Sequence, residues 1–504
     1  MTRSTRRPLA PAHTVLAVAL LAALPAAAAA PADAAAAMRA VPVATHAPLA
    51  LDDVRLVDLD AAAAGEAPRR CVRLEAGRIA RIAPAGDAAC RAGAGVRALD
   101  GRWLLPGLID MHAHLTLGPP AVEMRDGAPV MTAHADDAIA AHNARALLAY
   151  GVTTLRNPGG DLAAAARYRA ARASGALAGP ESFDAGAILN DVAIEGLAVA
   201  VADADAVRAE VAAQADAGAD WIKLYTGLSP ALLQVGIDAA HARGLPAVAH
   251  LDGVAWTDAL AMGLDGLVHL MPTSPDLLAP DARAAWQASA RPGTYVFFEW
   301  WEHVDPEGAE ADALVAAFAE RRPVFDATLV AFHAAFWQDQ ADAPYRDAAR
   351  LAPAPLREAW ETWFTFAAGW TPEDHARARA VWPKLQRLTV RLADSGARFT
   401  VGTDMGNPWV VPGLSMHQEM ALLVDAGLAP ARVLRAATVD AADALGAGAR
   451  LGRIAEGYEA DLLVLDADPR ADIAHALAIH AVFNDGVEAD AAPRTAFHRD
   501  GAER

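Results

Sequence analysis

Short apolar runs alternate with alanine-rich, helix-like stretches through the middle of the chain. Eight runs have the length of buried strands: 103–109, 152–155, 182–189, 221–225, 246–250, 266–270, 324–329 and 398–403. Strands that alternate with helices indicate parallel β/α units, because the helix carries the chain back to the start of the next strand. The pattern therefore predicts an α/β fold, a (β/α)8 TIM barrel with insertions, over residues 103–446.

Further strand-like runs lie near both ends of the chain, at 54–57, 71–74 and 78–82 and again at 460–465 and 481–484. Neither set is large enough to enclose a core alone. One small β-sandwich domain built from segments 38–102 and 447–504 would bury both sets. Within the barrel, residues 275–322 are expected to form an insertion, and residues 331–385 a helical excursion that could act as a lid.

The first 37 residues have the pattern of an export signal. Three arginines, at positions 3, 6 and 7, precede an apolar run over 15–24, and an alanine-rich tract follows to residue 37. This order is typical of a cleaved secretory signal peptide. The apolar run is shorter than the roughly 20 residues that span a bilayer. We expect a periplasmic or secreted protein without membrane attachment after cleavage, exported by either the Sec or the twin-arginine route.

Composition narrows the function classes. The 504 residues include 43 Lys and Arg against 62 Asp and Glu, a formal net charge of −19. An acidic chain is a poor candidate for binding nucleic acid, which needs a basic face. The two cysteines, Cys71 and Cys90, exclude a disulfide-dense scaffold and a cysteine-rich zinc fold. Export would permit a disulfide between them, and two separate thiols are the alternative.

Two histidines stand at alternate positions after the first barrel run. His112 and His114 follow residues 105–110, and alternate residues of a strand face the same side. That side is expected to be the carboxyl-terminal mouth of the barrel, where active sites of this architecture lie. Chelation of a metal by both imidazoles is the functional interpretation, and two structural histidines are the alternative.

Other polar residues end their own strand runs and should reach the same mouth. They are His250, His269 and Asp404. Neutral imidazoles and a carboxylate are typical ligands of zinc and similar divalent metals. Lys223 shares a strand face with Trp221 and Tyr225, where an ammonium beside cations would be repelled and poorly solvated. A lysine carbamate would resolve that conflict, and an ammonium in solvent or paired with an acid is the alternative.

Several of these motifs together resemble those of one family. They are LPGLIDMHAH at 105–114, GVTTLR at 151–156, GTD at 402–404 and GYEADLLVL at 457–465. The chain resembles the amidohydrolase superfamily from about residue 50 to 490, in particular its imidazolonepropionase-like and prolidase-type branch. The resemblance implies a distorted (β/α)8 barrel with a small β-sandwich made from both chain ends.

The resemblance also implies a binuclear metal centre of two divalent ions, with zinc as the default. One ion would be held by His112, His114 and Asp404, and the other by His250 and His269, with N6-carboxylated Lys223 as the bridge. The mononuclear imidazolonepropionases lack this lysine, so Lys223 favours the two-metal branch. Asp404 would accept a proton from the attacking metal-activated water and deliver it to the leaving nitrogen.

The expected activity is hydrolysis of an amide bond in a small molecule or dipeptide. A dipeptidase or carboxypeptidase of the Xaa-Pro type is the leading hypothesis. A cyclic-amide or N-acyl amino acid hydrolase and a non-catalytic scaffold are the alternatives. Candidate substrate contacts are Tyr225, Arg156 and His333, although each could instead serve in packing or ion pairing. The sequence leaves a homo-oligomer open.

Overall fold

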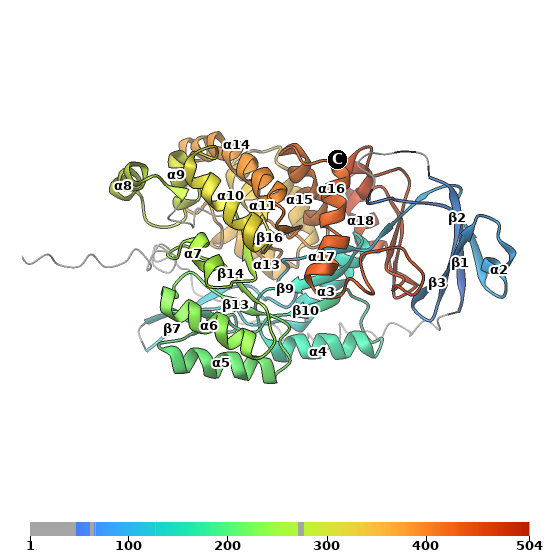
Figure 1. The fold of residues 1–504 in the computed structure, drawn as a ribbon, viewed down its shortest axis with the longest axis horizontal. Coiled ribbons are helices and arrows are strands. Elements are labelled where there is room, and N and C mark those ends of the chain that lie inside the picture. The colour runs from blue at the N-terminus through green and yellow to red at the C-terminus, as the bar shows by residue number, and fades with distance from the viewer. Residues whose placement is uncertain (1–46, 61–64, 66, 127, 271–276, 503–504) are drawn as a thin grey trace, which may run out of the picture.

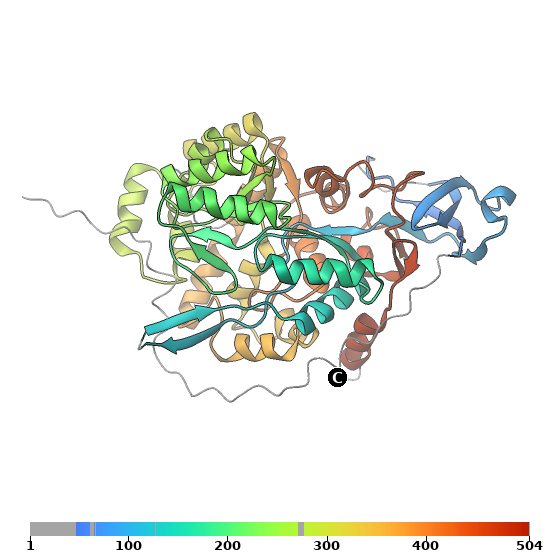
Figure 2. The same ribbon diagram turned by 90° about the horizontal axis from the view of Figure 1, so that it is seen from below.

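The computed structural model describes residues 47–60, 65, 67–126, 128–270 and 277–502 (Figure 1). The expected signal segment, residues 1–37, lies outside these ranges. Within them, no helix combines the length and the apolar character that crossing a bilayer would require. The chain has a mixed α/β fold in which parallel strands are surrounded by helices, as the alternating pattern predicts (Figures 1 and 2).

The parallel strands form two sheets. The smaller has the order β10 (Glu181–Asp184), β9 (Val152–Asn157) and β6 (Leu108–Asp110). The larger has the order β12 (Ala198–Ala200), β11 (Ile188–Asn190), β13 (Ile222–Leu224), β14 (Ala247–Ala249), β15 (Gly266–Val268), β16 (Val324–Asp326) and β17 (Arg398–Thr400). Each of the eight sequence runs therefore contains at least one strand.

Backbone contacts join both edges of the smaller sheet to the larger sheet. At one edge, Ala185 after β10 forms a parallel bridge with Trp221 before β13. At the other edge, the N–H of Met111 after β6 donates to the carbonyl of Val401 after β17 at 2.9 Å. The N–H of Asp404 then donates to the carbonyl of His112 at 2.7 Å. The ends of β6 and β17 therefore lie side by side, although they are far apart in sequence.

Four of the helices between the strands, α3 to α6, begin at a residue whose side chain caps the helix. Asp136 accepts from the N–H groups of Ala138 and Ile139 at the start of α3, and Asp203 caps α5 in the same way. The connecting helices are α3 (Asp137–Ala149), α4 (Leu162–Ala173), α5 (Ala204–Asp216), α6 (Pro230–Ala242), α7 (Trp256–Ala261), α15 (Leu414–Asp425), α16 (Pro430–Ala436) and α17 (Val439–Ala444). Their alanine-rich faces pack against the parallel strands, which gives the core its close packing.

The two expected insertions are helical and pack on each other. Between β15 and β16 lie α8 (Pro280–Ser289), α9 (Val296–His303) and α10 (Ala309–Arg321). Between β16 and β17 lie α11 (Leu329–Trp337), α12 (Pro344–Ala348), η4 (Ala349–Leu351), α13 (Ala354–Thr362) and α14 (Pro372–Asp394). The rings of Phe298 on α9 and Trp370 before α14 are 4.9 Å apart. A lid function for these helices stays a prediction.

Strands from both chain ends share one sheet. Its order is β20 (Val487–Glu488), β19 (Ile479–Asn484), β18 (Leu462–Leu465), β5 (Trp103–Pro106), β1 (Leu49–Leu56), β2 (Arg69–Glu75) and β3 (Arg78–Pro84), with β4 (Gly95–Ala98) paired to β1. A separate hairpin pairs β7 (Ala121–Arg125) with β8 (Ala128–Thr132), and α2 (Ala88–Arg91), η5 (Ile473–Leu477) and α18 (Ala492–Ala502) complete the described elements. The domain boundaries after residues 37, 102 and 446 stay predictions.

The run 103–109 differs from the expected single strand, because it divides between two sheets. β5 joins the sheet of the chain ends, and β6 joins the parallel strands. Gly107 stands at the division, and a Cβ there would lie 2.0 Å from Thr153 Oγ1. Only glycine fits this close approach, which lets the chain leave one sheet and enter the other. The run 182–189 likewise divides into β10 and β11.

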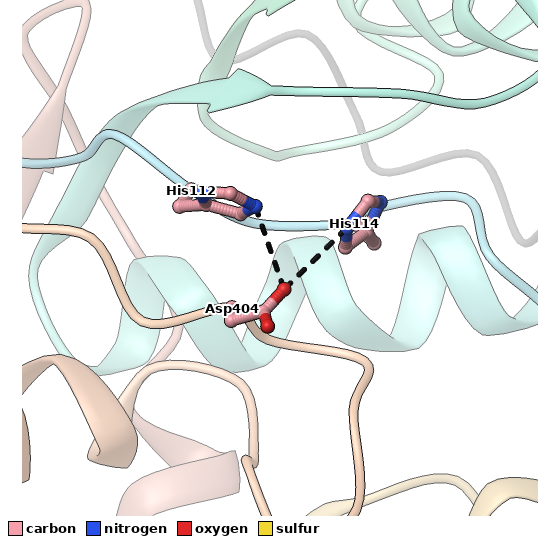
Figure 3. A group of neighbouring side chains, drawn as sticks. All are labelled: His112, His114 and Asp404. Atoms are coloured by element: carbon pink, nitrogen blue, oxygen red, sulfur yellow. Dashed lines mark ion pairs between the residues drawn. The ribbon is translucent and has the colours of Figure 1, made fainter. Parts of the chain in front are cut away.

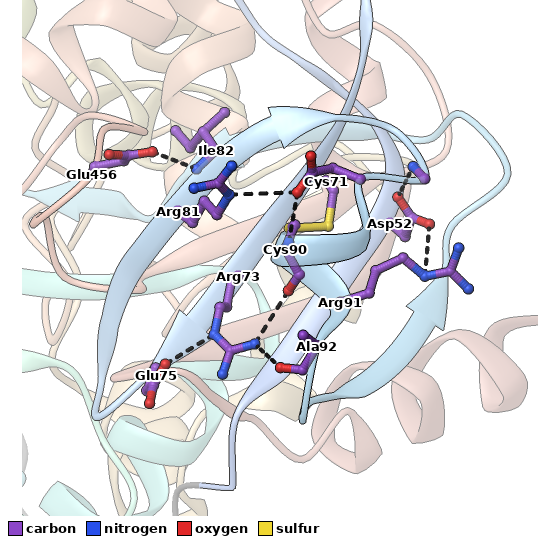
Figure 4. The surroundings of a disulfide bond; sticks show 12 residues. Asp52, Cys71, Arg73, Glu75, Arg81, Ile82, Cys90, Arg91, Ala92 and Glu456 are labelled. Atoms are coloured by element: carbon purple, nitrogen blue, oxygen red, sulfur yellow. Dashed lines mark hydrogen bonds and ion pairs between the residues drawn. A yellow bond between two sulfur atoms is a disulfide. The ribbon is translucent and has the colours of Figure 1, made fainter.

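Cys71 and Cys90 form a disulfide, which decides between the two alternatives that the sequence left open (Figure 4). Cys71 lies on β2 and Cys90 on α2, and both are fully buried. Arg73 holds the end of α2 by donating to the carbonyl of Ala92 at 2.7 Å. The disulfide and this contact fasten the short helix to the sheet.

Candidate metal centre

His112, His114 and Asp404 converge where β6 and β17 end. The Nε2 atoms of His112 and His114 lie 3.4 and 3.5 Å from Asp404 Oδ1 (Figure 3). One ligand atom from each of the three residues lies within 4.8 Å of the other two. The geometry thus brings together the first ligand group that the sequence predicts.

The far nitrogen of each histidine is held by an acceptor. His112 Nδ1 lies 2.9 Å from Asp326 Oδ1, and His114 Nδ1 lies 3.0 Å from the carbonyl of Gly159. A carbonyl oxygen only accepts, so His114 carries its proton on Nδ1 and presents the Nε2 lone pair to Asp404. An ionised Asp326 imposes the same tautomer on His112. Such supporting acceptors are typical of metal-binding histidines.

His250 and His269 lie next to this group. Their ring centroids are 4.8 Å apart, and those of His269 and His112 are 4.4 Å apart. His250 Nδ1 is buried without a hydrogen-bond partner among the described residues. Burial lowers the pKa of His250 to about 3, and burial with neighbouring cations lowers the pKa of His269 and His112 well below the usual value. These imidazoles are neutral, which is the form that binds metals.

Lys223 is a buried amine without a partner. Its side chain is 2% exposed, and its Nζ has no hydrogen-bond partner in the part of the chain that the structure describes. Burial, aided by the Arg156 guanidinium, lowers the pKa of Lys223 to about 7, against the opposite effect of Asp326 and Asp404. The alternative interpretation, an ammonium in solvent or paired with an acid, has neither solvent exposure nor a hydrogen-bonded acid among the described residues, and carboxylation of Lys223 stays a prediction.

The lysine count makes Lys223 more conspicuous. The chain has two lysines, Lys223 and Lys384, and all the other residues among its 43 Lys and Arg are arginines. Lys384 Nζ donates to the carbonyls of Trp301, Glu302 and Val304 at 2.8–2.9 Å. One lysine therefore has a structural role in ending α9. The other is placed among four histidines and an aspartate.

Three residues in or beside this group have left-handed backbone conformations. The φ angles are 65° at His269, 48° at Thr328 and 65° at Asp404. Such conformations of non-glycine residues cost about 1–3 kcal/mol each and occur where the surroundings impose them. Here the strand ends and the contacts of the side chains impose them, which orients His269 and Asp404 toward each other, with His269 Nδ1 3.9 Å from Asp404 Oδ2.

Arg156 differs from its expected role as an anchor for a substrate anion. Its side chain is fully buried, Nη2 donates to Asp326 Oδ2 at 2.7 Å, and Nε donates to the carbonyl of Met111 at 2.7 Å. The guanidinium is thus committed to a buried ion pair behind His112. Sequence reasoning missed Asp326, because it lies inside the predicted run 324–329, whereas the observed strand β16 ends at this residue.

The other two candidate substrate contacts lie in different surroundings. Tyr225 is partly exposed, and its ring stands edge-on to His250 at 4.8 Å, beside the centre. His333 lies on α11, stacks on Trp337 at 3.9 Å, and has its Nδ1 2.7 Å from the Tyr345 hydroxyl. Burial lowers the pKa of His333 to about 4. A substrate contact stays a prediction for both residues.

Comparisons with known proteins place the chain in a family. Residues 382–489 match the model of the amidohydrolase family. An imidazolonepropionase from Rhizorhabdus wittichii is 30% identical over 307 residues, which cover 53% of this chain and 76% of that protein. The structure of a bottromycin amidohydrolase aligns with a TM-score of 0.65 and 25% identity over 89% of this chain and 88% of the other.

The fold of a Xaa-Pro dipeptidase, solved with methionine in its active site, is also similar. It aligns with a TM-score of 0.62 and 20% identity, over 88% of this chain and 99% of that one. These similarities extend over both the parallel strands and the sheet of the chain ends. The chain therefore belongs to the amidohydrolase family, whose members depend on metals, and it is a hydrolase that acts on carbon–nitrogen bonds.

Proposed function

We propose that the chain is an exported binuclear amidohydrolase that cleaves an amide bond as a dipeptidase or carboxypeptidase of the Xaa-Pro type. The observation that carries the proposal is Lys223, a buried amine without a hydrogen-bond partner among the described residues, which acts electrostatically on His112, His250 and His269. A buried amine without a hydrogen-bond partner lowers the stability of the fold, so its presence here indicates a function in the site.

The donor set fits two divalent cations, with zinc as the default. His112, His114 and Asp404 would hold one ion, His250 and His269 the other, and carboxylated Lys223 would bridge them. Neutral imidazoles and carboxylates are the usual oxygen and nitrogen ligands of zinc. When bound, such ions lower the pKa of a water molecule and polarise an amide carbonyl.

Carboxylation would give Lys223 the charge that the site needs. The free amine nitrogen attacks the carbon of CO2, an N–C bond forms, and one proton leaves to solvent. The product is an anion with two oxygens, in place of an amine that has no acceptor. An unpaired ammonium at this depth is costly, whereas a carbamate between cations is stabilised by them.

Asp404 is suited to move the proton during amide hydrolysis. Its Oδ1 faces His112 and His114, and its Oδ2 lies 3.9 Å from His269 Nδ1, so the carboxylate stands between the two histidine pairs. From this position it would accept a proton from the attacking water and deliver it to the leaving nitrogen. Tyr225, beside His250, is the nearest candidate for orienting the substrate.

The wider features of the proposal have their own support. The contacts that join both edges of the smaller parallel sheet to the larger one support a distorted (β/α)8 barrel. The sheet shared by both chain ends supports a small β-sandwich domain. The Cys71–Cys90 disulfide supports export, because such bonds persist in oxidising compartments. Residues 1–37 would supply the export signal.

The carbamate can be tested directly because the chain has only two lysines. The protein is equilibrated with 13C-labelled bicarbonate and zinc, and carbamate carbon is observed by NMR. We expect one signal that is lost in Lys223→Met and kept in Lys384→Met, the matched control. A spectrum that Lys223→Met leaves unchanged would contradict the bridging role.

The substrate class needs a separate panel of Xaa-Pro dipeptides, N-acyl amino acids and ring amides. We expect cleavage of the dipeptides, with zinc restoring activity after chelation. The 30% identical imidazolonepropionase favours a second candidate, a cyclic-amide hydrolase, and cleavage of ring amides alone would establish it. Asp404→Asn should keep much of the bound metal and lose activity by a factor of about 10²–10⁴, as expected for a general acid–base group. Near-normal turnover would remove this role.

A further inference from the structure

Asp326, the last residue of β16, and Thr328, two residues beyond it, each contact the Nδ1 atom of one histidine. Asp326 Oδ1 lies 2.9 Å from His112 Nδ1, and Thr328 Oγ1 lies 2.8 Å from His269 Nδ1. Asp326 and Thr328, which we call the β16 pair, are both fully buried. In the proposed centre, His112 and His269 belong to different metal ions, although β16 itself supplies no ligand.

The position of β16 explains how one strand reaches both histidines. β16 lies between β15, which precedes His269, and β17, which precedes Asp404. The backbone reinforces the side-chain contacts, because the N–H of His269 donates to the carbonyl of Asp326 at 2.9 Å. The end of β16 is therefore in contact with ligands on both of its sides.

The β16 pair is itself held in place from two other elements. Arg156 on β9 donates to Asp326 Oδ2 at 2.7 Å. Glu419 on α15 accepts from the N–H groups of Leu329 and Val330 at 3.0 and 2.6 Å, immediately after Thr328. These bonds hold Thr328 in its left-handed conformation, with φ of 48°, which a β-branched residue rarely adopts.

The contacts at Nδ1 affect which nitrogen of each imidazole can bind a metal. A neutral imidazole carries one N–H and one lone pair, so an acceptor at Nδ1 leaves the lone pair on Nε2. The Asp326 carboxylate, which only accepts, imposes this tautomer on His112, whereas the Thr328 hydroxyl fixes the orientation of the His269 ring by bonding to its Nδ1, which leaves Nε2 free of this contact. Without these contacts, each ring could turn or exchange tautomer and present an N–H to the cation.

We propose that Asp326 and Thr328 are positioning residues that select the ligating nitrogen of one histidine in each half of the centre, so that β16 preorganises both metal sites. This inference rests on the proposed function, because it assumes two ions. Among the strands from β13 to β17, β16 is the one that supplies no proposed ligand, and the inference assigns it a positioning role.

Thr328→Val and Thr328→Ser form the matched test. Valine keeps the shape and loses the hydroxyl, whereas serine keeps the hydroxyl. Each purified chain is depleted of metal and titrated with zinc against a competing chelator, with folding checked by circular dichroism. We expect Thr328→Val to weaken one of two zinc equivalents by about 10–100-fold, the usual effect of losing such a supporting contact, and Thr328→Ser to keep both.

The Asp326 contact is tested in the double variant Asp326→Leu with Arg156→Met. Both partners of the ion pair are replaced, because a buried guanidinium without its carboxylate would destabilise the fold. This double variant should also retain one tight equivalent, whereas adding Thr328→Val should leave none. If the double variant does not fold, the Thr328 pair of variants decides the question alone.

The outcomes distinguish the proposed binuclear centre from the proposed role of β16. A wild-type chain that binds fewer than two zinc equivalents overturns the proposed binuclear centre, and the role of β16 with it. A wild type that binds two, with Thr328→Val unchanged or Thr328→Ser equally weakened, overturns the role of β16 alone. A triple variant that keeps one tight equivalent shows that both contacts serve the same ion, which also contradicts the inference.

Discussion

The hydroxyl of Thr403 donates to Asp110 Oδ2 at 2.7 Å, and this bond joins the strand end before His112 to the strand end before Asp404. Asp110 Oδ1 also accepts from the N–H groups of His112 and Thr403, at 3.0 and 3.1 Å. One buried carboxyl group therefore sets the register between β6 and β17. Since His112 and His114 follow β6 and Asp404 follows β17, the same group sets the geometry of the first proposed ligand site.

Asp110→Ala should destabilise the protein and weaken zinc binding. The substitution leaves three buried donors without their acceptor, and each such loss costs about 1–3 kcal/mol. Asp110→Asn is the matched control, because its amide oxygen can still accept from both N–H groups. We expect Asp110→Ala to lower the melting temperature and the zinc affinity far more than Asp110→Asn does. Equal effects of the two variants would show that the hydrogen bonds of Asp110 contribute little.

Lys384→Met should loosen the contact between the two helical insertions. Lys384 on α14 donates to three carbonyls at the carboxyl end of α9, where a cation also interacts favourably with the helix dipole. We expect a loss of about 1–3 kcal/mol, the range for hydrogen bonds from a charged group. Hydrogen exchange followed by mass spectrometry should show faster exchange in residues 296–304. Unchanged exchange there would mean that packing of Phe298 on Trp370 holds α9 without the lysine.

Much of the candidate site could be predicted because strand ends are visible in sequence. Parallel strands present their carboxyl ends at one edge, so polar residues that end apolar runs, such as His250 and Asp404, meet there. The α/β fold follows from the same periodicity. The division of 103–109 could not be predicted, because both of its halves are apolar, and only the tertiary contact of Gly107 with Thr153 separates them.

The supporting residues were harder to predict than the ligands. An arginine at a strand end has the same pattern whether it binds a substrate anion or pairs with a buried acid, and the partner of Arg156, Asp326, is 170 positions away. Thr328 has an unusual backbone conformation that its residue type disfavours. Both facts arise from packing between segments that are distant in sequence. Periodicity within one segment carries no record of them.

The buried carboxyl group of Asp461 should make stability depend on pH. Asp461 precedes β18, accepts from the N–H of Asp485 at 2.8 Å and from Asn484 at 3.1 Å through Oδ1, and leaves Oδ2 buried without a partner among the described residues. Burial raises the pKa of Asp461 to about 7, and the Asp485 carboxylate adds to this. The folded chain therefore binds a proton here more tightly than the unfolded chain.

The sign of the effect follows from this raised pKa. The contribution of Asp461 to stability is complete below the unfolded pKa of about 4 and is lost as the pH rises to about 7. Asp461→Asn keeps the Oδ1 contacts and carries no charge. Its melting temperature relative to wild type should therefore rise between pH 4 and pH 7 and then stay level, with linkage limiting the gain to about 4 kcal/mol. A difference that does not change with pH would show that Asp461 titrates normally.

Removal of the Cys71–Cys90 disulfide should lower stability without changing catalysis. The bond closes a loop over a sequence separation of 19 residues, for which a loss of about 3 kcal/mol is expected. β2 and α2 lie at the end of the molecule away from the parallel strands (Figure 1), so the metal ligands keep their positions. The variant with both cysteines replaced by serine should melt at a lower temperature and keep its kcat and zinc content. A reducing agent should shift the wild type by a similar amount and leave the serine variant unchanged, and a wild type that does not respond to reduction would contradict the stabilising role of the disulfide.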